Sequence, residues 1–423
     1  MIIPIALALI WLSGCDMVSI NTSINTPTDE INTLKSSVDE QIKWLEKNIN
    51  DDPKNIANYI TLSSLYLQRI RETADVSAYE QIASLMREAE KIDPKNSDIL
   101  SLQSQIELGR HNFWSGKILI QRAIDINPNR AAYYGILGDT QIELGEYTGA
   151  VDSFQKMIDM RPDYNSYIRI GYIRELYWDI PGAINSLKLA IDAGSKYPEN
   201  IAYAYVELWK LELRENLENA KQYFESSIRL VPEYPPALEW LGKVAYYNQD
   251  LTLARSYFEK AYARLPIVQY LINLADLDIV MGRVVEANQK LTLAEITFDT
   301  TQKSGINTDL EESLFLSDHD LRLPDALTMA KRAYLVRPNI FAADNLSWAL
   351  YKNKEYSEAA KYTTWAPIQG EHDPFILYHQ GMIALKNNNS TEAQRYLNGA
   401  LELHPRFSII DSQQAAEILN SIK

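Results

Sequence analysis

The chain has 423 residues, of which 46% are hydrophobic and 23% are charged, as in ordinary folded proteins. Its formal net charge is −15 and its pI is about 4.9. This acidic field would repel a phosphate backbone, and no basic block interrupts it, so we expect no nucleic-acid partner.

The first fourteen residues are apolar and uncharged. They read MIIPIALALIWLSG, which is shorter than the roughly 20 residues that a helix needs to span a bilayer. Their length and composition predict the apolar core of a secretory signal peptide over residues 1–14. The pattern departs from the usual one because no Lys or Arg precedes the apolar run.

A possible lipid anchor follows this segment. Leu12-Ser13-Gly14-Cys15 resembles the lipobox of bacterial lipoproteins, and Cys15 is the single cysteine of the chain. The resemblance implies that Cys15 carries a diacylglycerol and anchors the protein, since two or more acyl chains hold a protein stably at a membrane. Asp16 resembles the signal that retains lipoproteins at the inner membrane. We therefore expect a bacterial cell-membrane protein that faces the periplasm or the cell exterior, with the inner membrane favoured.

The next segment is polar and has no helical periodicity. Residues 19–32 read SINTSINTPTDEIN, a composition typical of a flexible connection. The sequence therefore predicts a tether over residues 15–38, between the lipid and the folded body.

Seven prolines then recur at almost regular intervals. The first six are separated by 34, 34, 36, 34 and 34 residues: Pro94, Pro128, Pro162, Pro198, Pro232, Pro266 and, further on, Pro338. A 34-residue period that ends in proline is typical of the tetratricopeptide repeat (TPR), a stack of helix–turn–helix units.

The repeat from Ala131 to Pro162 shows the frame most clearly. Gly138 and Ala150 stand at positions 8 and 20, where small side chains let the two helices of a unit cross closely. Phe154 fills the groove at position 24, and Pro162 ends the second helix because its ring cannot continue the hydrogen-bond ladder. The same frame recurs in later repeats, with an insertion near residues 302–307.

These patterns predict an all-α fold. We expect a right-handed TPR superhelical solenoid of about ten helix–turn–helix units over residues 39–405, followed by a capping helix over residues 406–423.

Several phrases also resemble one group of bacterial TPR proteins over nearly the whole chain. They include residues 174–184 (RELYWDIPGAI), 343–351 (ADNLSWALY) and 377–384 (LYHQGMIA). Members of this group are usually named only for their repeats, so the resemblance supports the fold and says little about the biochemical role.

No sequence motif indicates catalysis. A phosphate-binding Gly-x-x-x-x-Gly-Lys loop is missing, and the carboxylates are scattered over helix faces. The triplets 318–320 (DHD) and 371–373 (EHD) lack a second His four residues away, so we interpret them as solvated loop or helix-end charge rather than metal ligands. We therefore expect no enzymatic activity, no cofactor and no metal site.

The concave wall of the array is the predicted binding site. The repeat frame places aromatic and charged residues from three successive first helices on this wall, where we expect one continuous patch midway along the groove: Tyr172, Tyr205, Trp209, Glu239, Lys243, Tyr246 and Tyr247. Such rings either stack on a partner or pack against the next unit, because aromatic side chains with a polar tip suit both roles. Truncating Trp209 to alanine should weaken partner capture and leave the melting temperature nearly unchanged, because the stability of a solenoid is spread over many unit interfaces.

Two functions remain open. The first is a membrane-tethered scaffold that binds a protein or peptide in its concave groove and assembles or stabilises an envelope complex. The alternative is a carbohydrate- or small-ligand-binding TPR lipoprotein. We favour the scaffold because the insertion near residues 302–307 is too short to build a separate sugar site.

The lipobox assignment makes a direct prediction. Replacing Cys15 by serine should abolish metabolic labelling with a radioactive fatty acid, because the hydroxyl cannot replace the thiol that accepts the diacylglycerol. The precursor should be released or stalled, as fractionation would show. Unchanged labelling of the variant would mean that Cys15 is not the lipid attachment site.

Overall fold

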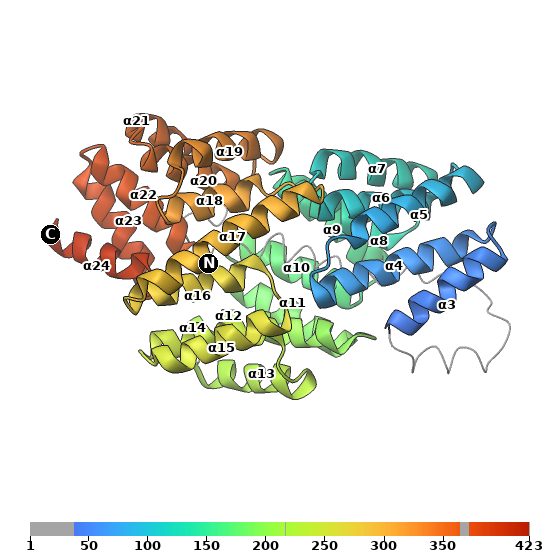
Figure 1. The fold of residues 1–423 in the computed structure, drawn as a ribbon, viewed down its shortest axis with the longest axis horizontal. Helices are drawn as coiled ribbons and strands as arrows, with labels where there is room; N and C mark the ends of the chain where they lie inside the picture. The colour runs from blue at the N-terminus through green and yellow to red at the C-terminus, as the bar shows by residue number, and fades with distance from the viewer. Residues whose placement is uncertain (1–37, 216, 364–371, 423) are drawn as a thin grey trace.

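The computed structural model describes residues 38–215, 217–363 and 372–422, and the structural statements below concern these residues. Here the chain forms 22 α-helices and one short 3-10 helix, with no β-strand (Figure 1). The predicted signal peptide over residues 1–14, Cys15, Asp16 and the tether up to residue 37 lie outside the described residues.

The helices form ten consecutive pairs, preceded by α3 (Val38–Asp51) and followed by α24 (Asp411–Ser421). The pairs are α4 (Ile56–Thr73) and α5 (Ala78–Ile92), α6 (Ser97–Gly109) and α7 (Phe113–Ile126), α8 (Ala131–Glu143) and α9 (Tyr147–Met160), α10 (Tyr164–Leu176) and α11 (Ile180–Ala193), α12 (Pro198–Glu215) and α13 (Leu217–Leu230), α14 (Pro235–Tyr247) and α15 (Leu251–Arg264), α16 (Val268–Val280) and α17 (Val284–Lys303), α18 (Asp309–Asp318) and α19 (Leu323–Val336), α20 (Ile340–Lys352) and α21 (Tyr356–Ala359) with the 3-10 helix η1 (Ala360–Tyr362), and α22 (Pro374–Lys386) and α23 (Ser390–Leu403). The predicted all-α solenoid of about ten units is confirmed.

Proline positions explain where most second helices end. The helix α9 ends at Met160, two residues before Pro162, and α15 ends at Arg264, two residues before Pro266. Pro198 has a different role, because it is the first residue of α12. Proline is favoured there since the first helical N–H has no partner within the helix.

Small residues set the distance between the two helices of a unit. A Cβ atom at Gly138 would lie 2.3 Å from the ring of Phe154, and one at Gly242 would lie 2.3 Å from the ring of Phe258. Both contacts join positions 8 and 24 of the repeat frame. The rings therefore occupy the space that a larger residue on the first helix would need.

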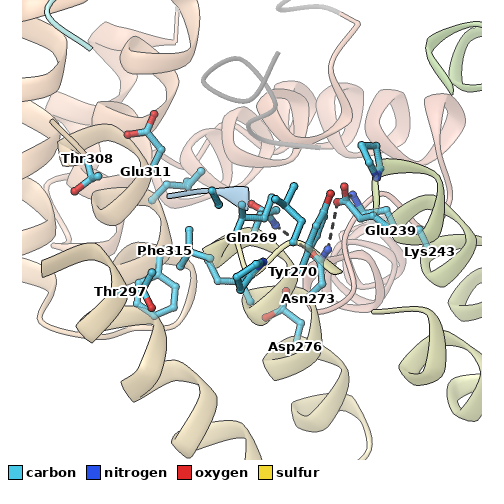
Figure 2. A pocket seen from close by; sticks show the side chains of 18 of the residues that line it. Glu239, Lys243, Gln269, Tyr270, Asn273, Asp276, Thr297, Thr308, Glu311 and Phe315 are labelled. Atoms are coloured by element: carbon cyan, nitrogen blue, oxygen red, sulfur yellow. Dashed lines mark hydrogen bonds and ion pairs between the residues drawn. The ribbon is translucent and has the colours of Figure 1, made fainter. Parts of the chain in front are cut away.

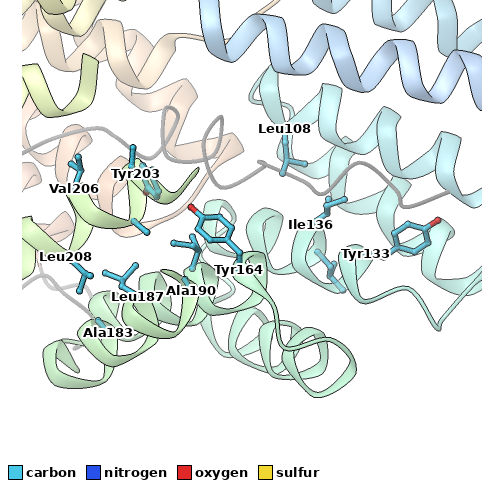
Figure 3. Close-up of a cluster of buried hydrophobic side chains, with 14 of the residues drawn as sticks. Leu108, Tyr133, Ile136, Tyr164, Ala183, Leu187, Ala190, Tyr203, Val206 and Leu208 are labelled. Atoms are coloured by element: carbon cyan, nitrogen blue, oxygen red, sulfur yellow. The ribbon is translucent and has the colours of Figure 1, made fainter. Parts of the chain in front are cut away.

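The core is continuous from one unit to the next. In the stretch from α6 to α14, buried side chains from successive units interdigitate, and Figure 3 shows Tyr133, Tyr164 and Tyr203 among smaller aliphatic residues. Each unit thus buries apolar side chains against its neighbours, as expected of a solenoid.

The superhelix also closes on itself, which the repeat pattern does not predict. The second, third and fourth units contact the loops before the eighth, ninth and tenth units, and we call these contacts the seam. In Figure 1, α17 leads from the centre of the molecule toward α6 and α7. At its end, Asn307 donates its backbone N–H to the carbonyl of Arg110 at 3.0 Å, and His111 Nδ1 donates to the carbonyl of Asn307 at 2.7 Å.

A buried ion pair lies at the next point of the seam. Arg337 bonds the carboxylate of Glu143 through Nη2 and that of Glu311 through Nη1, the latter at 3.1 Å. Asn339 donates to the backbone carbonyl of Glu143 at 3.2 Å, and Ile340 donates its N–H to the Tyr147 hydroxyl at 3.0 Å. These bonds join α8 and α9 to the loop before α20.

The predicted insertion near residues 302–307 forms part of this seam. It extends α17 to Lys303, and the loop that follows brings Ile306 into the core of the first two units. The extra residues therefore connect two turns of the superhelix.

The seam can be tested at Gly145. This residue has φ +72°, and a Cβ atom there would lie 2.4 Å from the carbonyl oxygen of Pro338 on the other turn. We expect Gly145→Ala to lower the free energy of unfolding, measured in urea, by clearly more than the roughly 1–2 kcal/mol that a left-handed alanine costs.

Gly282→Ala is the matched control. Gly282 has φ +70°, but a Cβ atom added there would meet no neighbouring heavy atom within 4 Å. The Gly282→Ala variant therefore measures only the free-energy cost of placing alanine in a left-handed backbone conformation. Equal losses for the two variants would mean that the turns do not touch at Gly145 in solution.

Candidate functional site

Closure of the superhelix leaves a partly open interior cavity of about 380 Å³. Its walls are formed by α12, α14, α16 and α18, together with residues of the first unit, α17, the loop before α18 and the segment before α24. Figure 2 shows α14 on one side, α18 on the other and the side chains of α16 between them. The cavity therefore combines residues that are far apart in the sequence.

On the α14 side, the polar groups are already paired. Lys243 Nζ lies 2.5 Å from Glu239 Oε1, which also accepts a 3.2 Å hydrogen bond from Asn273 of α16. The Lys243 ammonium lies 4.6 Å from the centroid of the Trp240 ring, within the range of a cation–π contact. This wall presents an aromatic surface with a balanced ion pair.

On the α18 side, His319 is held as a cation. Its Nε2 donates to Asp276 Oδ1 at 2.8 Å and its Nδ1 donates to the carbonyl of Phe315 at 2.7 Å, so both ring nitrogens face acceptors. Burial lowers the pKa of His319, but the hydrogen bond and charge of Asp276 outweigh it and raise the pKa to about 9. His319 is the C-cap of α18 and only 3% of its side chain is exposed, so residues 318–320 are helix-end charge, as one interpretation held, but His319 is not solvated.

Beside His319, two carboxyl groups share one end of the cavity. Asp318 Oδ1 accepts the indole N–H of Trp348 at 2.8 Å, and Asp411 Oδ2 accepts the hydroxyl of Ser408 at 2.8 Å. Burial and the charge of Asp411 raise the pKa of Asp318 to about 6. This end of the cavity therefore concentrates acidic groups.

The segment before α24 closes this end of the cavity. The Tyr246 hydroxyl donates to the carbonyl of Ile409 at 2.9 Å, and the ring of Tyr247 lies 4.7 Å from that of His404. The C-terminal region, predicted only as a cap, thus also supplies part of the cavity wall.

The predicted groove residues do not form one patch. Glu239, Lys243 and Tyr247 line the cavity, as predicted for a concave wall. Tyr246 instead contacts the C-terminal segment, and Tyr205 stacks on Tyr223 of its own unit with ring centroids 6.3 Å apart.

Tyr172 and Trp209 pack within the array. The Tyr172 hydroxyl is buried, and burial raises its pKa well above the usual value. Trp209 is 4% exposed and packs between Phe224 and Trp240, with centroids 5.9 and 5.3 Å away. Truncating this ring would remove core packing of a kind that contributes about 3–5 kcal/mol, so an unchanged melting temperature no longer follows.

The sequence prediction missed the α18 residues and Asp411. Asp276 and the helix after Thr308 belong to first helices of their units, so the repeat frame could have indicated both. Nothing periodic links Asp411 or the loop before α18 to this wall, because they reach it only through closure of the superhelix.

Other kinds of site find no support in the described part of the chain. No group of three or more His, Cys, Asp or Glu side chains is placed to hold a metal ion there. No helix within the same ranges is both long enough and apolar enough to cross a bilayer. That the protein is not an enzyme and binds no cofactor or nucleic acid stays a prediction.

Two segments match family models described as tetratricopeptide repeat. They are residues 131–164, which include the whole third unit, and residues 214–266, which extend from the end of α12 past α15. No curated protein matches the chain. Together with the helix pairing, these matches establish TPR repeats in the chain and a TPR solenoid as its fold.

Several solved structures share this architecture at low identity. PilF of Pseudomonas aeruginosa is 19% identical, with 48% of this chain and 92% of that chain covered and a TM-score of 0.38. PilW, described as a type IV pilus biogenesis factor, is 16% identical, with coverages of 48% and 94% and a TM-score of 0.39. Yeast Tom70 is 14% identical, with 93% of both chains covered and a TM-score of 0.41. Likeness at this level indicates no partner.

The charge of His319 predicts a pH-dependent stability. Its pKa of about 9 in the folded state exceeds the ordinary value of 6.5, so its stabilisation is complete below pH 6.5 and is lost as pH rises through 9. The loss should be on the order of 3 kcal/mol, from 2.5 pKa units at 1.36 kcal/mol each. Urea unfolding between pH 6 and pH 9.5 would measure it.

His319→Gln is the reference for this measurement. The difference in unfolding free energy between the two proteins should shrink as pH rises. A difference that stays constant across this range would show that His319 is not charged in the folded protein.

Proposed function

We propose that this protein is a membrane-tethered TPR scaffold of the bacterial envelope, which holds a protein partner and assembles or stabilises a complex. The observation that carries the proposal is the interior cavity, where aromatic and apolar side chains of α14, α16 and α18 converge around a few polar groups. TPR solenoids use their concave surfaces for binding. The cavity is an open part of this surface.

Other parts of the concave wall are filled by the protein itself. In the third and fourth units, Arg169 makes a two-pronged ion pair with Asp139, at 2.9 and 2.7 Å, and both side chains are buried. In the third unit, Glu143 is covered by Arg337. A partner segment would therefore enter between α14 and α18 rather than along the whole array.

The tether in this proposal rests on the sequence. The lipobox-like segment ending at Cys15 supports a lipid anchor, and the polar stretch after it supports a flexible connection to the array. Asp16 favours the inner membrane, with the array facing the periplasm or the cell exterior. The lipid would be the protein's contact with the membrane.

A small ligand is the second candidate. A cavity of about 380 Å³ lies within the roughly 300–1,000 Å³ that small-molecule sites occupy. Trp240 and Tyr247 would offer stacking surfaces to a sugar or another small molecule.

In-cell photocrosslinking distinguishes these functions. Gln269 is half-buried and lines the cavity, so p-benzoylphenylalanine at this position should form a crosslink to a protein in the membrane fraction. The control places p-benzoylphenylalanine at Lys260, which is exposed on α15, and it should form no crosslink to a protein in the membrane fraction.

Two outcomes would count against the scaffold. Equal crosslinking from residues 269 and 260 would show that the cavity does not select the partner. A product whose mass increases only by that of a small molecule would favour the second candidate.

A further inference from the structure

One face of α18 runs along the cavity. Glu311, Leu314, Phe315 and Asp318 all line it, and their spacing of three, four and seven residues places them on one side of the helix. At 1.5 Å per residue, the two acidic positions are about 10 Å apart along the axis. These four residues, which we call the acidic stripe of α18, therefore have a carboxylate at each end and apolar side chains between.

Only one oxygen of the Glu311 carboxylate has a hydrogen-bond partner among the described residues. Its Oε1 accepts from Arg337, but its buried Oε2 has no hydrogen-bond partner among the described residues. His111 Nδ1 is 3.9 Å from this oxygen but donates to Asn307 instead, and burial lowers the pKa of His111 below its usual range. Arg337 also faces Glu143, so its single charge cannot neutralise both carboxylates.

The hydroxyl of Thr308, at the same end of the stripe, is a second polar group without a hydrogen-bond partner among the described residues. Thr308 stands at the N-cap of α18, where a threonine hydroxyl ordinarily bonds a backbone N–H of the first turn. Here it makes no capping bond, and its Oγ1 has no partner among the described residues although Thr308 is 5% exposed and lines the cavity. A buried polar atom of this kind normally finds a partner, so a donor from a ligand would satisfy it.

The other end of the stripe is acidic for a different reason. Asp318 and Asp411 both line the cavity, and burial together with the charge of Asp411 raises the pKa of Asp318 to about 6. Asp318 also ends α18, and the partial negative charge at a helix C-terminus favours a cation. The charges of His379 and His319 lower the pKa of Asp318 but do not outweigh burial and Asp411, so an added positive charge would relieve the remaining repulsion between these carboxyl groups.

The two lysines on the far wall do not serve this purpose, and Arg406, which also lines the cavity, donates to the backbone carbonyl of Tyr246 at 3.5 Å. Lys243 is bonded to Glu239 within α14, and Lys210 lies 2.6 Å from Glu207 within α12. Each of these lysines therefore has a carboxylate of its own helix as partner.

We propose that the cavity binds an extended peptide segment with two basic side chains, one at Glu311 and Thr308 and the other at Asp318 and Asp411, with apolar residues between them. This assignment rests on the proposed function, because it names the partner segment that the scaffold would hold. Residues three apart in an extended chain are about 10 Å apart, which matches the spacing on α18.

A matched pair of peptides tests the assignment. The probe is N-acetyl-Arg-Leu-Leu-Arg-amide, and the control replaces both arginines by citrulline, which keeps the shape without the charge. Calorimetric titration into the purified protein should give binding at least about tenfold tighter for the arginine peptide, since hydrogen bonds to charged groups contribute more than neutral ones.

Two variants locate the contacts without removing bonds within the protein. Thr308→Val removes a hydroxyl that has no partner, and Asp318→Asn keeps an oxygen that can accept from Trp348. We expect each variant to weaken arginine-peptide binding by about three- to tenfold, while stability at pH 8 stays equal or rises. Glu259→Gln is the control, because Glu259 is exposed on α15 and is not one of the residues that line the cavity, and it should leave binding nearly unchanged.

Several results would overturn the assignment. These are equal binding of both peptides, no binding of either, or unchanged affinity in both Thr308→Val and Asp318→Asn. If 1,8-diaminooctane bound as tightly as the arginine peptide, two positive charges alone would suffice, and the ligand would be a free diamine rather than a peptide. The scaffold proposal is judged separately by crosslinking at residue 269, so either can fail alone.

Discussion

The buried guanidinium of Arg337 joins two turns of the superhelix. It bonds Glu143 of the third unit and Glu311 of the eighth. The Arg337 Cζ atom lies 4.9 Å from the centroid of the Phe113 ring, and only 4% of the Arg337 side chain is exposed. Removing one partner of a buried ion pair typically costs about 3–5 kcal/mol, because the remaining charge stays desolvated. The seam around Arg337 therefore turns a linear array into a closed body, and the interior cavity exists because of it.

Closure changes what a solenoid can do. In an open array, each unit contacts only its neighbours, and the concave surface is one long groove. Here parts of that surface are occupied by the chain's own ion pairs, such as Asp139 with Arg169, and what remains is a cavity between α14 and α18. A short segment with defined charges fits such a site better than a long folded partner. The acidic stripe of α18 faces the balanced Glu239–Lys243 pair across this space, so charge selection would come from one wall.

The sequence predicted the local features of the fold and missed the distant contacts. Pro162 and Gly138 act at fixed positions within a unit, so the 34-residue period was enough to predict helix ends and close helix crossings. Trp209 was misjudged because the same periodic position can face the groove or the next unit, and the large Trp240 beside it makes it a core residue. His111 and Asn307 are 196 residues apart, and no repeat pattern links their contact. His319 bonds Asp276 of the adjacent unit, a contact between neighbouring first helices, but a helix-end histidine carries no periodic signal that it is buried.

Measuring the distance between the two turns tests this account most directly. A fragment that begins at residue 38 contains no cysteine, so spin labels can be attached at Asn112→Cys and Ser304→Cys, both exposed positions beside the seam. The 3.0 Å hydrogen bond between Asn307 and Arg110, with two and three residues of chain on either side, limits the two Cα atoms to a separation of about 25 Å. Double electron–electron resonance should therefore give one narrow distribution at short distance. A broad distribution centred well beyond that limit would show that the superhelix is open in solution and would contradict the account.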